Sequence, residues 1–418
     1  MTISNKILEA RENRAKLIDN LTNDNKIIVS IKANIPGNNK SIYLAYLIIN
    51  SFSLNQLKIK INKAYFYKSD DGPFHLLEIK SNNLEKTKNK LIDFENNWPL
   101  GRFIDLDLYS KDKLISRKIK RKCFFCNNLA INCLRKGNHS VEEVYAYIES
   151  KTLDYYHDLL LNCIDESIIL ELDLDPKFGL VTKKTKGSHK DMDYDLMLKA
   201  KDAIIPYFFD IFLEAAKSKD NLETILIKVK KIGIKAEKSM FEVTNHVNAY
   251  KGLIFHLGLI ISAYSYIISR RLDMTFLDVI KYLANTFFRK KDIYNTFGEF
   301  AYENYKITGA IGEAINGYKH VSQALKKIND FSDESLLNTL IYLISEIEDT
   351  TLLKRANTLE YYLEIKDRFK NLEINRDSIR NLTQYCIKEN LSFGGSADLL
   401  IVTIFIKKIM VICDKINL

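Results

Sequence analysis

Short segments that combine glycine, hydroxyl and acidic residues are the first feature of this sequence that could carry chemistry. One runs from Gly187 to Asp193 (GSHKDMD) and another from Ser392 to Asp398 (SFGGSAD). Glycine lets the backbone approach a phosphate closely, hydroxyl and main-chain N–H groups can bind its oxygens, and carboxylates hold the magnesium ion that shields nucleotide charge. A separate acidic pair lies within the segment Gly101–Asp107 (GRFIDLD). These segments predict two phosphate-handling sites in one chain.

The pair Asp105 and Asp107 is a candidate metal site in the first half of the chain. Because residues i and i+2 of a strand point to the same face, both carboxylates can bind one divalent ion. Such an ion aligns an attacking hydroxyl group and neutralises charge on a pyrophosphate leaving group, as nucleotidyl transfer requires. The alternative is two exposed carboxylates on an edge strand. Neighbouring basic residues that can bind phosphate oxygens favour the metal site. They are Arg102 and the run that starts at Arg117 and ends at Lys122.

Three cysteines and a histidine follow this basic run. Cys123, Cys126, Cys133 and His139 have the spacing C-x2-C-x6-C-x5-H. In a cytoplasmic protein this clustering favours a structural tetrahedral Zn2+ site over disulfides. The zinc site would hold the basic loop beside the acidic pair. The alternatives are reduced thiols packed in a core and a His139 that simply precedes a helix capped by Ser140.

Acidic residues recur in the second half of the chain, each beside small or hydroxyl residues. They are Glu237, Glu313, Asp349 and Asp398. In a helical bundle such carboxylates can point into a common cavity and hold a metal. For any one of them a helix cap or a surface position is the alternative, and Asp191 could likewise cap a helix that starts near Tyr194.

Two kinds of periodicity divide the chain into an α+β part and a helical part. Up to about residue 115, amphipathic and extended segments alternate, and from about residue 142 onward the apolar residues recur almost entirely with the period of a helix. We therefore predict an N-terminal α+β domain at residues 1–163 and an all-α domain at 164–418, although no Gly/Pro/Ser-rich linker marks the boundary. The predicted helices are 3–21, 42–52 and 83–96, and the predicted strands are 26–35, 64–68, 74–80 and 102–109.

The charge is distributed unevenly. Residues 1–150 contain 25 Lys and Arg against 16 Asp and Glu, whereas residues 151–418 contain 37 of each, so the net charge of +9 belongs to the first part. A basic surface beside an acidic pair suits a polyphosphate ligand or an acidic protein partner better than nucleic acid, because no helix-turn-helix or RNA-binding motif accompanies it. The alternative is a solvated lysine-rich surface.

Apolar segments do not predict a membrane protein. The N-terminal segment 1–16 is polar and lacks the apolar stretch of a secretory signal, so we expect a cytoplasmic protein. The runs 252–269 and 399–413 are short for a membrane span and contain polar or basic residues, and we expect both to be buried core helices.

Several strings in the first half form a joint pattern. They are Asn34–Gly37, Gly101–Asp107, Ile115–Arg117 and Arg121–Cys126, with Cys133, Arg135 and His139–Glu143. This pattern resembles the apo-citrate lyase phosphoribosyl-dephospho-CoA transferase family over about residues 5–150. Its members transfer phosphoribosyl-dephospho-CoA from a triphosphate donor to a serine of the apo acyl carrier (gamma) subunit and release pyrophosphate. The resemblance implies a nucleotidyltransferase-like domain in which Asp105 and Asp107 bind Mg2+ and the carrier serine is the nucleophile.

A second set of strings follows in one order over the helical half. They are Gly179–Val181, Gly187–Asp193, Ala236–Met240, Val247–Gly252, Gly309–Ala314, Asp349–Thr350 and Gly394–Leu400. They resemble the triphosphoribosyl-dephospho-CoA synthase family, an all-helical group that joins the ribose of ATP to 3'-dephospho-CoA and expels adenine. The two families are known as a fused pair, so each resemblance supports the other.

The second resemblance implies roles for the residues of these strings. Departure of adenine leaves oxocarbenium-like character at C1' while the 2'-hydroxyl of dephospho-CoA loses a proton, and carboxylates can serve both ends. We predict Mg2+ ligands at Asp191, Asp193 and Asp398 and a proton acceptor at Glu237 or Glu313. The predicted substrate-binding and phosphate-binding residues are Gly187, Ser188, His189, Lys190, Asn248, Lys251, Gly394, Gly395 and Ser396.

The helical half departs from the family pattern in several loops. Where the family usually reads Gly-Val-Asn-Thr-His-Lys-Gly, this chain has Ala249 and Tyr250 in place of the threonine and the histidine. Tyrosine does not titrate near neutral pH as histidine does. A usual Asp-Thr-Asn becomes Asp349–Thr351, and a usual Arg-Gly-Gly becomes Arg355–Asn357. These changes leave the acidic residues in place but alter what lies between them.

Three functions are compatible with these residues. The leading hypothesis is a bifunctional transferase that makes and installs the citrate lyase prosthetic group from ATP and 3'-dephospho-CoA. The alternative is that only the N-terminal transferase is active and the helical domain is a scaffold or binds the donor. A non-catalytic nucleotide-binding regulator with a zinc site is the third.

Overall fold

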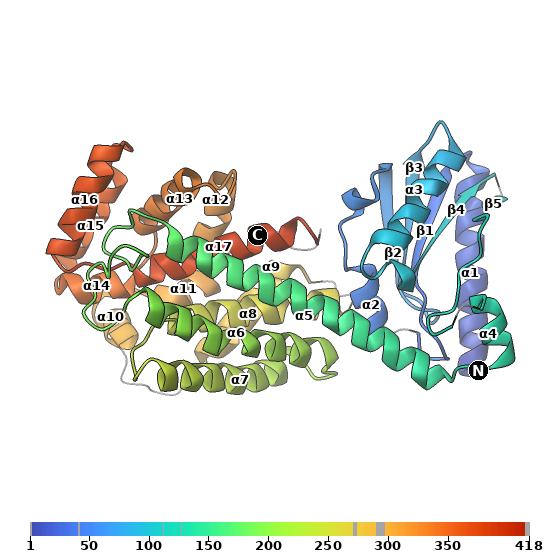
Figure 1. Ribbon diagram of the computed structural model, residues 1–418, viewed down its shortest axis with the longest axis horizontal. Coiled ribbons are helices and arrows are strands. Elements are labelled where there is room, and N and C mark those ends of the chain that lie inside the picture. The colour runs from blue at the N-terminus through green and yellow to red at the C-terminus, as the bar shows by residue number, and fades with distance from the viewer. Residues whose placement is uncertain are drawn as a thin grey trace. The chain divides into compact units, whose positions relative to one another are not determined.

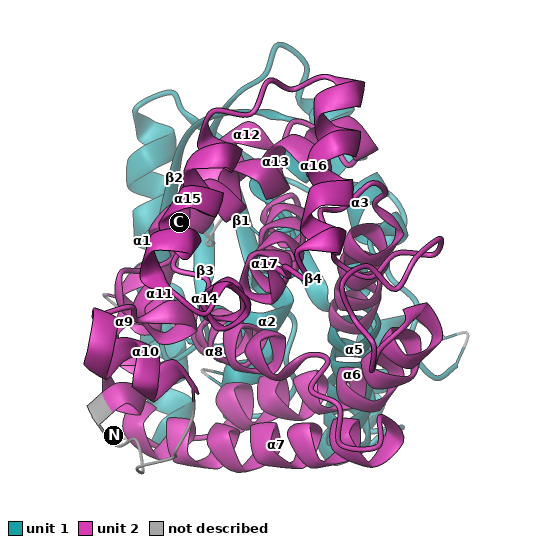
Figure 2. Ribbon diagram, turned by 90° about the vertical axis from the view of Figure 1, so that its left-hand side faces the viewer, with its two compact units in different colours: residues 1–158, 268–271, 412–414 teal, residues 159–267, 272–411, 415–418 magenta. Residues whose placement is uncertain are grey.

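The protein folds as two compact units (Figure 2). The computed structural model describes residues 2–40, 42–111, 113–126, 128–270, 274–289 and 297–413. The first unit consists mainly of residues up to 158, and the second mainly of residues 159–411.

The first unit contains a small antiparallel sheet with helices on both faces (Figure 1). The strand order is β2-β3-β1-β4-β5, and every neighbouring pair is antiparallel. The predicted helices and strands of this part are confirmed, except that residues 101–103 form a 3-10 turn before the last predicted strand. The elements are α1 (Ile3–Asn23), β1 (Ile27–Ala33), α2 (Tyr43–Ile49), η1 (Leu54–Leu57), β2 (Lys60–Tyr67), β3 (Phe74–Lys80), α3 (Leu84–Asn97), η2 (Gly101–Phe103), β4 (Ile104–Ser110), β5 (Lys113–Ile115) and α4 (Ala130–Lys136).

The two faces of the sheet have different cores because strand side chains alternate between faces. Ile104, Leu106 and Leu108 of β4 join the larger core, which also contains residues of α2 and α3. The smaller core contains Ile18 of α1 and Ile28 of β1, with Tyr109 packed against it. Asp105 and Asp107 therefore lie on the face that α1 covers.

The second unit is helical throughout the residues described, which confirms the predicted helical second part. Helix α5 (Val141–Asp173) contributes residues to both units. The remaining helices are α6 (Tyr194–Lys217), α7 (Leu222–Val243), α8 (Lys251–Ile268), α9 (Phe276–Arg289), α10 (Phe297–Tyr305), α11 (Gly309–Ile315), α12 (Lys319–Lys327), α13 (Asp333–Glu346), α14 (Thr350–Ala356), α15 (Leu359–Lys370), α16 (Arg376–Lys388) and α17 (Gly394–Met410).

Polar residues at helix starts explain where several of these helices begin. The side chains of Asn221, Ser332, Thr358 and Asn375 each accept a hydrogen bond from the main chain of the helix that follows. Such N-caps satisfy N–H groups that have no partner within the helix. The cap of α6 is Asp193, not Asp191, the alternative considered from the sequence.

Helix α8 is a core helix. In the described part of the chain it is the one helix long and apolar enough to be a candidate membrane span, but 78% of it is buried inside the protein. Its burial agrees with the core helix expected from the sequence. Helix α17 is buried along most of its length as well.

Candidate functional sites

The face of the first unit that carries Asp105 and Asp107 combines acidic and basic groups. Asp105 is the cross-strand partner of Lys32, and Asp107 that of Ser30. Burial, together with the nearby carboxylate of Asp105, raises the pKa of Asp107 above its usual range. Two carboxylates that repel each other in this way are suited to hold a divalent cation, which would relieve the repulsion.

A buried carboxylate that sequence reasoning missed organises the basic groups on this face. Asp71, in the turn between β2 and β3, is fully buried and accepts hydrogen bonds from Arg11 Nε (3.1 Å), Arg14 Nη1 (2.8 Å) and Lys32 Nζ. Although burial opposes ionisation, the contacts with Lys32 and Arg14 keep the pKa of Asp71 below its usual range. Burial lowers the pKa of Lys32 to about 8, against the opposing effect of Asp71. From the sequence, Asp71 is only a hairpin residue, because its three partners lie 39 to 60 residues away.

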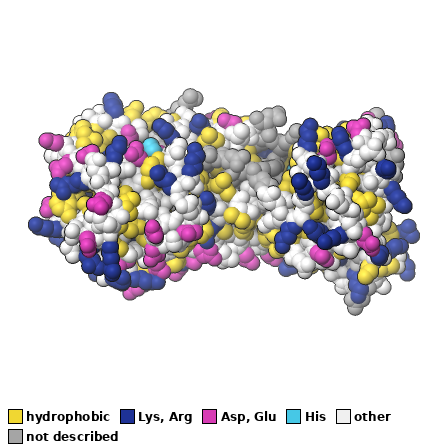
Figure 3. Space-filling view, turned by 90° about the horizontal axis from the view of Figure 1, so that it is seen from above, with side chains coloured by type: hydrophobic (Ala, Val, Ile, Leu, Met, Phe, Trp, Pro, Cys, Tyr) yellow, Lys and Arg dark blue, Asp and Glu magenta, His cyan; other side chains and the backbone are white. Residues whose placement is uncertain are grey.

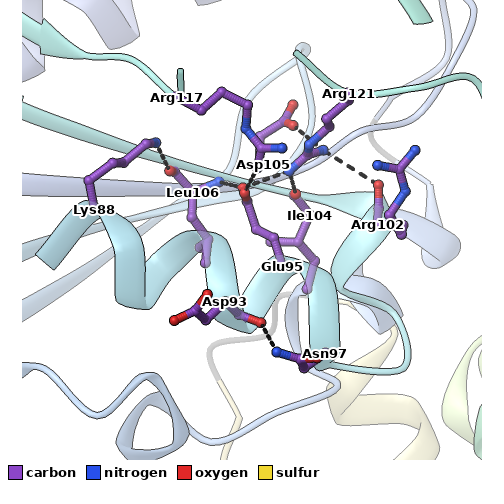
Figure 4. A network of polar contacts seen from close by, with 10 residues as sticks. All are labelled: Lys88, Asp93, Glu95, Asn97, Arg102, Ile104, Asp105, Leu106, Arg117 and Arg121. Carbon is purple, nitrogen blue, oxygen red and sulfur yellow. Dashed lines mark hydrogen bonds and ion pairs between the residues drawn. The ribbon is translucent and has the colours of Figure 1, made fainter. Parts of the chain in front are cut away.

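Arg121 connects the acidic pair to a second ion cluster (Figure 4). Its guanidinium lies 2.8 Å from Asp105 Oδ1 and 2.6 Å from Glu95 Oε1, and it donates to the main-chain oxygen of Ile104. Glu95 in turn accepts a hydrogen bond from Leu106 N at 2.8 Å. Arg121 and Glu95 therefore bind the main chain of β4 on the same stretch that presents Asp105 and Asp107.

The three basic residues predicted to bind phosphate all lie near this cluster. Arg117 forms an ion pair with the buried Glu95. Arg102 donates to the main-chain oxygen of Lys122 at 2.6 Å and lies over the Phe124 ring, and the side chain of Lys122 is exposed. Their roles in phosphate binding remain predictions, and Arg121 is the residue of the run that contacts the acidic pair.

The three cysteines and the histidine of the predicted zinc site come together. The ligand atoms of Cys123, Cys126, Cys133 and His139 all lie within 4.8 Å of one another. The sulfur atoms of Cys126 and Cys133 are 3.3 Å apart, near the ~3.8 Å edge expected for a tetrahedron with Zn–S bonds of about 2.3 Å. His139 Nε2 is buried and has no hydrogen-bond partner among the residues that the structure describes. A zinc ion fits this donor set. The cluster also adjoins the acidic pair, because Arg121 O accepts a main-chain hydrogen bond from Ala130 of α4.

The second unit contains a cavity of about 900 Å³. It is lined by segments that are far apart in the sequence, including the ends of α5, α8 and α17. The first residues of α8 and α17 contribute Lys251, Gly252, Gly394 and Gly395. Helix N-termini favour anions because their N–H groups are unpaired and the helix dipole is positive there. The side chains of Lys354 and Arg355 add positive charge to the lining.

Acidic groups lie close to these anion-attracting ends. Asp398 and Glu171 both line the cavity. Burial, with the carboxylates of Asp349 and Glu171 nearby, raises the pKa of Asp398 well above its usual range. Gly252 leaves room for the Asp398 carboxylate, because a Cβ at position 252 would lie 2.1 Å from Oδ2. Glu171 pairs with the buried Lys177 at 2.8 Å, and a Mg2+ ion bound to a triphosphate would supply further positive charge beside Asp398.

Asp349 has a different role, because its carboxylate joins the start of α14 to the start of α17. Its Oδ1 accepts from Thr351 N and Leu352 N at the start of α14. Its Oδ2 accepts from Ser396 N at 2.8 Å and Ser396 Oγ at 2.9 Å, near the start of α17. Gly395 allows this approach, because a Cβ there would lie 3.1 Å from Asp349 Cγ.

Comparisons with known proteins cover both units. The family model described as apo-citrate lyase phosphoribosyl-dephospho-CoA transferase (CitX) matches residues 3–155, and the model described as ATP:dephospho-CoA triphosphoribosyl transferase (CitG) matches residues 158–414. A protein named CitXG from Leuconostoc mesenteroides subsp. cremoris is 30% identical over 92% of each chain. The chain belongs to the CitXG family. The resemblance to a fused pair is thereby confirmed.

Other relatives of this CitXG family member match one or both halves. A CitXG protein from Haemophilus influenzae is 29% identical over 96% of this chain and 94% of its own length. A 2-(5''-triphosphoribosyl)-3'-dephosphocoenzyme-A synthase from Haemophilus ducreyi is 30% identical over 67% of this chain and 98% of its own length.

About half of the predicted site residues of the CitG-like half line the cavity. These are His189, Asp191, Asn248, Lys251, Glu313, Gly394, Gly395 and Asp398. Those not among its lining residues are Gly187, Ser188, Lys190, Asp193, Glu237 and Ser396.

Structural contacts account for most of the residues outside the cavity lining. Gly187 and Ser188 lie against Gly179, since Ser188 N donates to Gly179 O and a Cβ at Gly187 would be 2.2 Å from that oxygen. Asp193 caps α6, and Glu237 pairs with Lys251 at 3.2 Å. The predicted roles of these residues in catalysis and binding stay predictions.

The tyrosine that departs from the family pattern also faces the cavity. Tyr250 is buried, and its hydroxyl has no hydrogen-bond partner in the described structure. Burial, with Glu171 and Asp398 nearby, raises its pKa well above the usual range. Tyr250 therefore stays protonated at neutral pH and cannot accept a proton there.

Proposed function

We propose that this chain is a bifunctional transferase that makes the citrate lyase prosthetic group and attaches it to its carrier. In the first reaction, ATP and 3'-dephospho-CoA give 2'-(5''-triphosphoribosyl)-3'-dephospho-CoA and adenine. In the second, phosphoribosyl-dephospho-CoA is transferred to a serine of the apo acyl carrier (gamma) subunit, and pyrophosphate leaves. The observation that carries the proposal is the presence of two separate sites, one in each unit, in which carboxylates lie near basic side chains. The two units match two families that act in sequence.

The cavity of the second unit is suited to the first reaction. The N-termini of α8 and α17 and the side chains of Lys354 and Arg355 would bind the triphosphate of ATP. Asp398, Glu171 and Asp191 would hold Mg2+, which neutralises triphosphate charge when bound. The volume of about 900 Å³ accommodates large ligands of this kind.

The sheet face of the first unit is suited to the second reaction. Asp105 and Asp107 would hold a Mg2+ ion that neutralises charge on the leaving pyrophosphate. Arg121 fixes Asp105, and Arg14 and Lys32 lie on the same face to meet phosphate oxygens. The serine that attacks belongs to the carrier, so this chain supplies orientation and charge. We assign a nucleotidyltransferase-like role to this domain on the same grounds.

We also propose that the cluster of three cysteines and His139 binds a structural Zn2+ ion. Support comes from the proximity of the four donor atoms and from the unpartnered, buried His139 Nε2. We further assign the transferase domain to residues 1–163, the synthase domain to residues 164–418 and the protein to the cytoplasm, with no nucleic acid or membrane partner.

Two product measurements test the proposed function. The purified chain with Mg2+, ATP and 3'-dephospho-CoA should release adenine, detected by chromatography with mass detection, and the apo carrier should then gain the mass of phosphoribosyl-dephospho-CoA. An unchanged carrier mass would contradict the proposal.

The alternative that only the N-terminal transferase is active has one observation in its favour, the buried Tyr250 in place of the usual histidine. In that case adenine would not appear, and only preformed triphosphoribosyl donor would label the carrier.

A further inference from the structure

Three histidines line the cavity of the second unit, and two of them are poorly placed to accept a proton. His256 is buried, its Nδ1 lies 2.9 Å from the hydroxyl of Tyr318, and burial lowers its pKa to about 4. His189 Nε2 lies 2.9 Å from Ser392 Oγ, and burial together with Arg355 lowers its pKa. The third histidine is His320.

His320 is held by a carboxylate in a way that the other two are not. Its Nδ1 lies 2.7 Å from Oε2 of Glu313, and its main-chain N donates to Oε1 of the same residue at 2.9 Å. Glu313 on α11 thus fixes both the backbone and the ring of His320 at the start of α12. The His320 side chain is 27% exposed, and the residue lines the cavity. No described residue forms a hydrogen bond with its Nε2.

This arrangement determines what each residue of the pair can do. A carboxylate that accepts the Nδ1 proton selects the tautomer with a free lone pair on Nε2, and it stabilises the imidazolium that forms on protonation. Both oxygens of Glu313 are already engaged by His320, so Glu313 is a positioning residue and not itself the proton acceptor. Glu237, the other predicted acceptor, does not line the cavity.

We infer that Nε2 of His320 accepts the proton from the 2'-hydroxyl of dephospho-CoA in the first reaction. The inference rests on the proposed function of this cavity. As O2' of dephospho-CoA bonds to C1' of the ATP ribose, the C1'–N9 bond breaks and its electron pair leaves with adenine. The O2' proton goes to His320 and then to solvent, and adenine takes up a proton from solvent, so the overall reaction conserves protons.

The test compares His320→Ala with a matched histidine variant in full-length protein. His157 on α5 also has its Nδ1 near a carboxylate, Asp158 Oδ1 at 3.0 Å, but is exposed and does not line the cavity. For His320→Ala we expect kcat for adenine release to fall roughly 100- to 10,000-fold, the range for loss of a general base. KM for both substrates should change by less than about threefold, and added imidazole should restore part of the rate, because it can replace the missing ring. His157→Ala should keep the wild-type rate.

Glu313→Gln gives a second measurement, which tests whether Glu313 positions the His320 ring or binds substrate. We expect a fall in kcat smaller than that of His320→Ala, with no rescue by imidazole because the His320 ring is still present. A His320→Ala rate within threefold of wild type would overturn the inference. So would a slow variant that imidazole does not rescue and that has also lost ATP binding, since His320 would then be structural. Adenine release by the wild-type chain is measured first. If there is none, the proposed function itself fails, whatever the variants do.

Discussion

At the residue scale, the most unusual group is the half-buried Asp398 beside Gly252. Its pKa is raised well above the usual range by burial and by neighbouring carboxylates. A raised carboxyl pKa means that the folded state binds the proton more tightly than the unfolded state. Stability is therefore lost as pH rises above the ordinary carboxyl value of about 4 and through the raised value. Asp398 costs folding free energy at neutral pH, which is typical of a functional group.

We predict that Asp398→Asn stabilises the protein and abolishes adenine release. The amide keeps the shape of the carboxyl group but carries no charge, so the free energy of unfolding at neutral pH should rise by roughly 0.5–2 kcal/mol. Thermal denaturation at a series of pH values measures this, and the difference from wild type should grow as pH rises above about 4. Asp191→Asn is the control, because Asp191 also lines the cavity but is 61% exposed. An equal or lower stability of the Asp398 variant would contradict the argument.

His256 predicts a pH effect with the opposite sign. Burial lowers its pKa from 6.5 to about 4, so the folded state disfavours the protonated ring. Below pH 6.5 the unfolded chain takes up a proton that the folded chain does not, and stability is lost as pH falls toward 4. The loss from this group is about 3 kcal/mol. Denaturant unfolding at pH 7 and pH 4.5 should show a smaller pH dependence for His256→Gln than for wild type. Equal slopes in the two proteins would show that another group is responsible.

At the element scale, the strands, most helices and the acidic pair of β4 were predictable because they depend on local patterns. Alternation places Asp105 and Asp107 on one face whatever the partner strand is. The ion cluster around Asp71 and the hydrogen bonds between Glu313 and His320 were not predictable from such patterns. Asp71 meets its partners only when α1 and β1 pack beside the β2–β3 turn. Glu313 and His320 are seven residues apart, but a turn between two helices brings them together.

The α4 region gives a prediction at this scale, because the cysteine cluster adjoins Arg121. We expect about one zinc per chain by elemental analysis, and a loss of that zinc in Cys133→Ala. Carrier labelling from preformed donor should fall roughly 10-fold or more, since the loop would no longer hold Arg121 against Asp105. Cys163→Ala removes a cysteine of α5 outside the cluster and should retain both zinc and activity. A protein that contains no zinc and is fully active would refute the structural role.

At the scale of the whole molecule, the two sites are built from different residues of one chain. We predict that Asp107→Asn stops carrier labelling but not adenine release. Asp398→Asn should stop adenine release but still label the carrier from preformed donor. Neither variant alone should label the carrier from ATP and dephospho-CoA, but a mixture should, because the soluble donor passes from one molecule to the other. Mass spectrometry of the carrier measures this. If the mixture leaves the carrier unlabelled although each variant still catalyses its own reaction, the triphosphoribosyl donor is not released from the protein.

The surface of the molecule shows charge of both signs. The net charge of +9 comes from residues 1–150, yet on the face drawn in Figure 3 Lys and Arg side chains are interspersed with Asp and Glu. Several basic residues of the first unit form ion pairs with the buried carboxylates of Asp71 and Glu95. The net charge of +9 already counts these two carboxylates, so the ion pairs affect where the positive charge lies and not its total.

Helix α5 has a consequence for how such a protein could be divided. It is unbroken from Val141 to Asp173, and its residues belong to both compact units. Its buried side chains include Ile148 and Tyr156 on the first unit's part and Leu160 and Ile164 on the second's. A chain divided between the two units, at residue 158, would be cut inside a hydrogen-bonded helix. Such a cut would create two new helix ends, whose unpaired main-chain N–H and C=O groups would need capping residues or water.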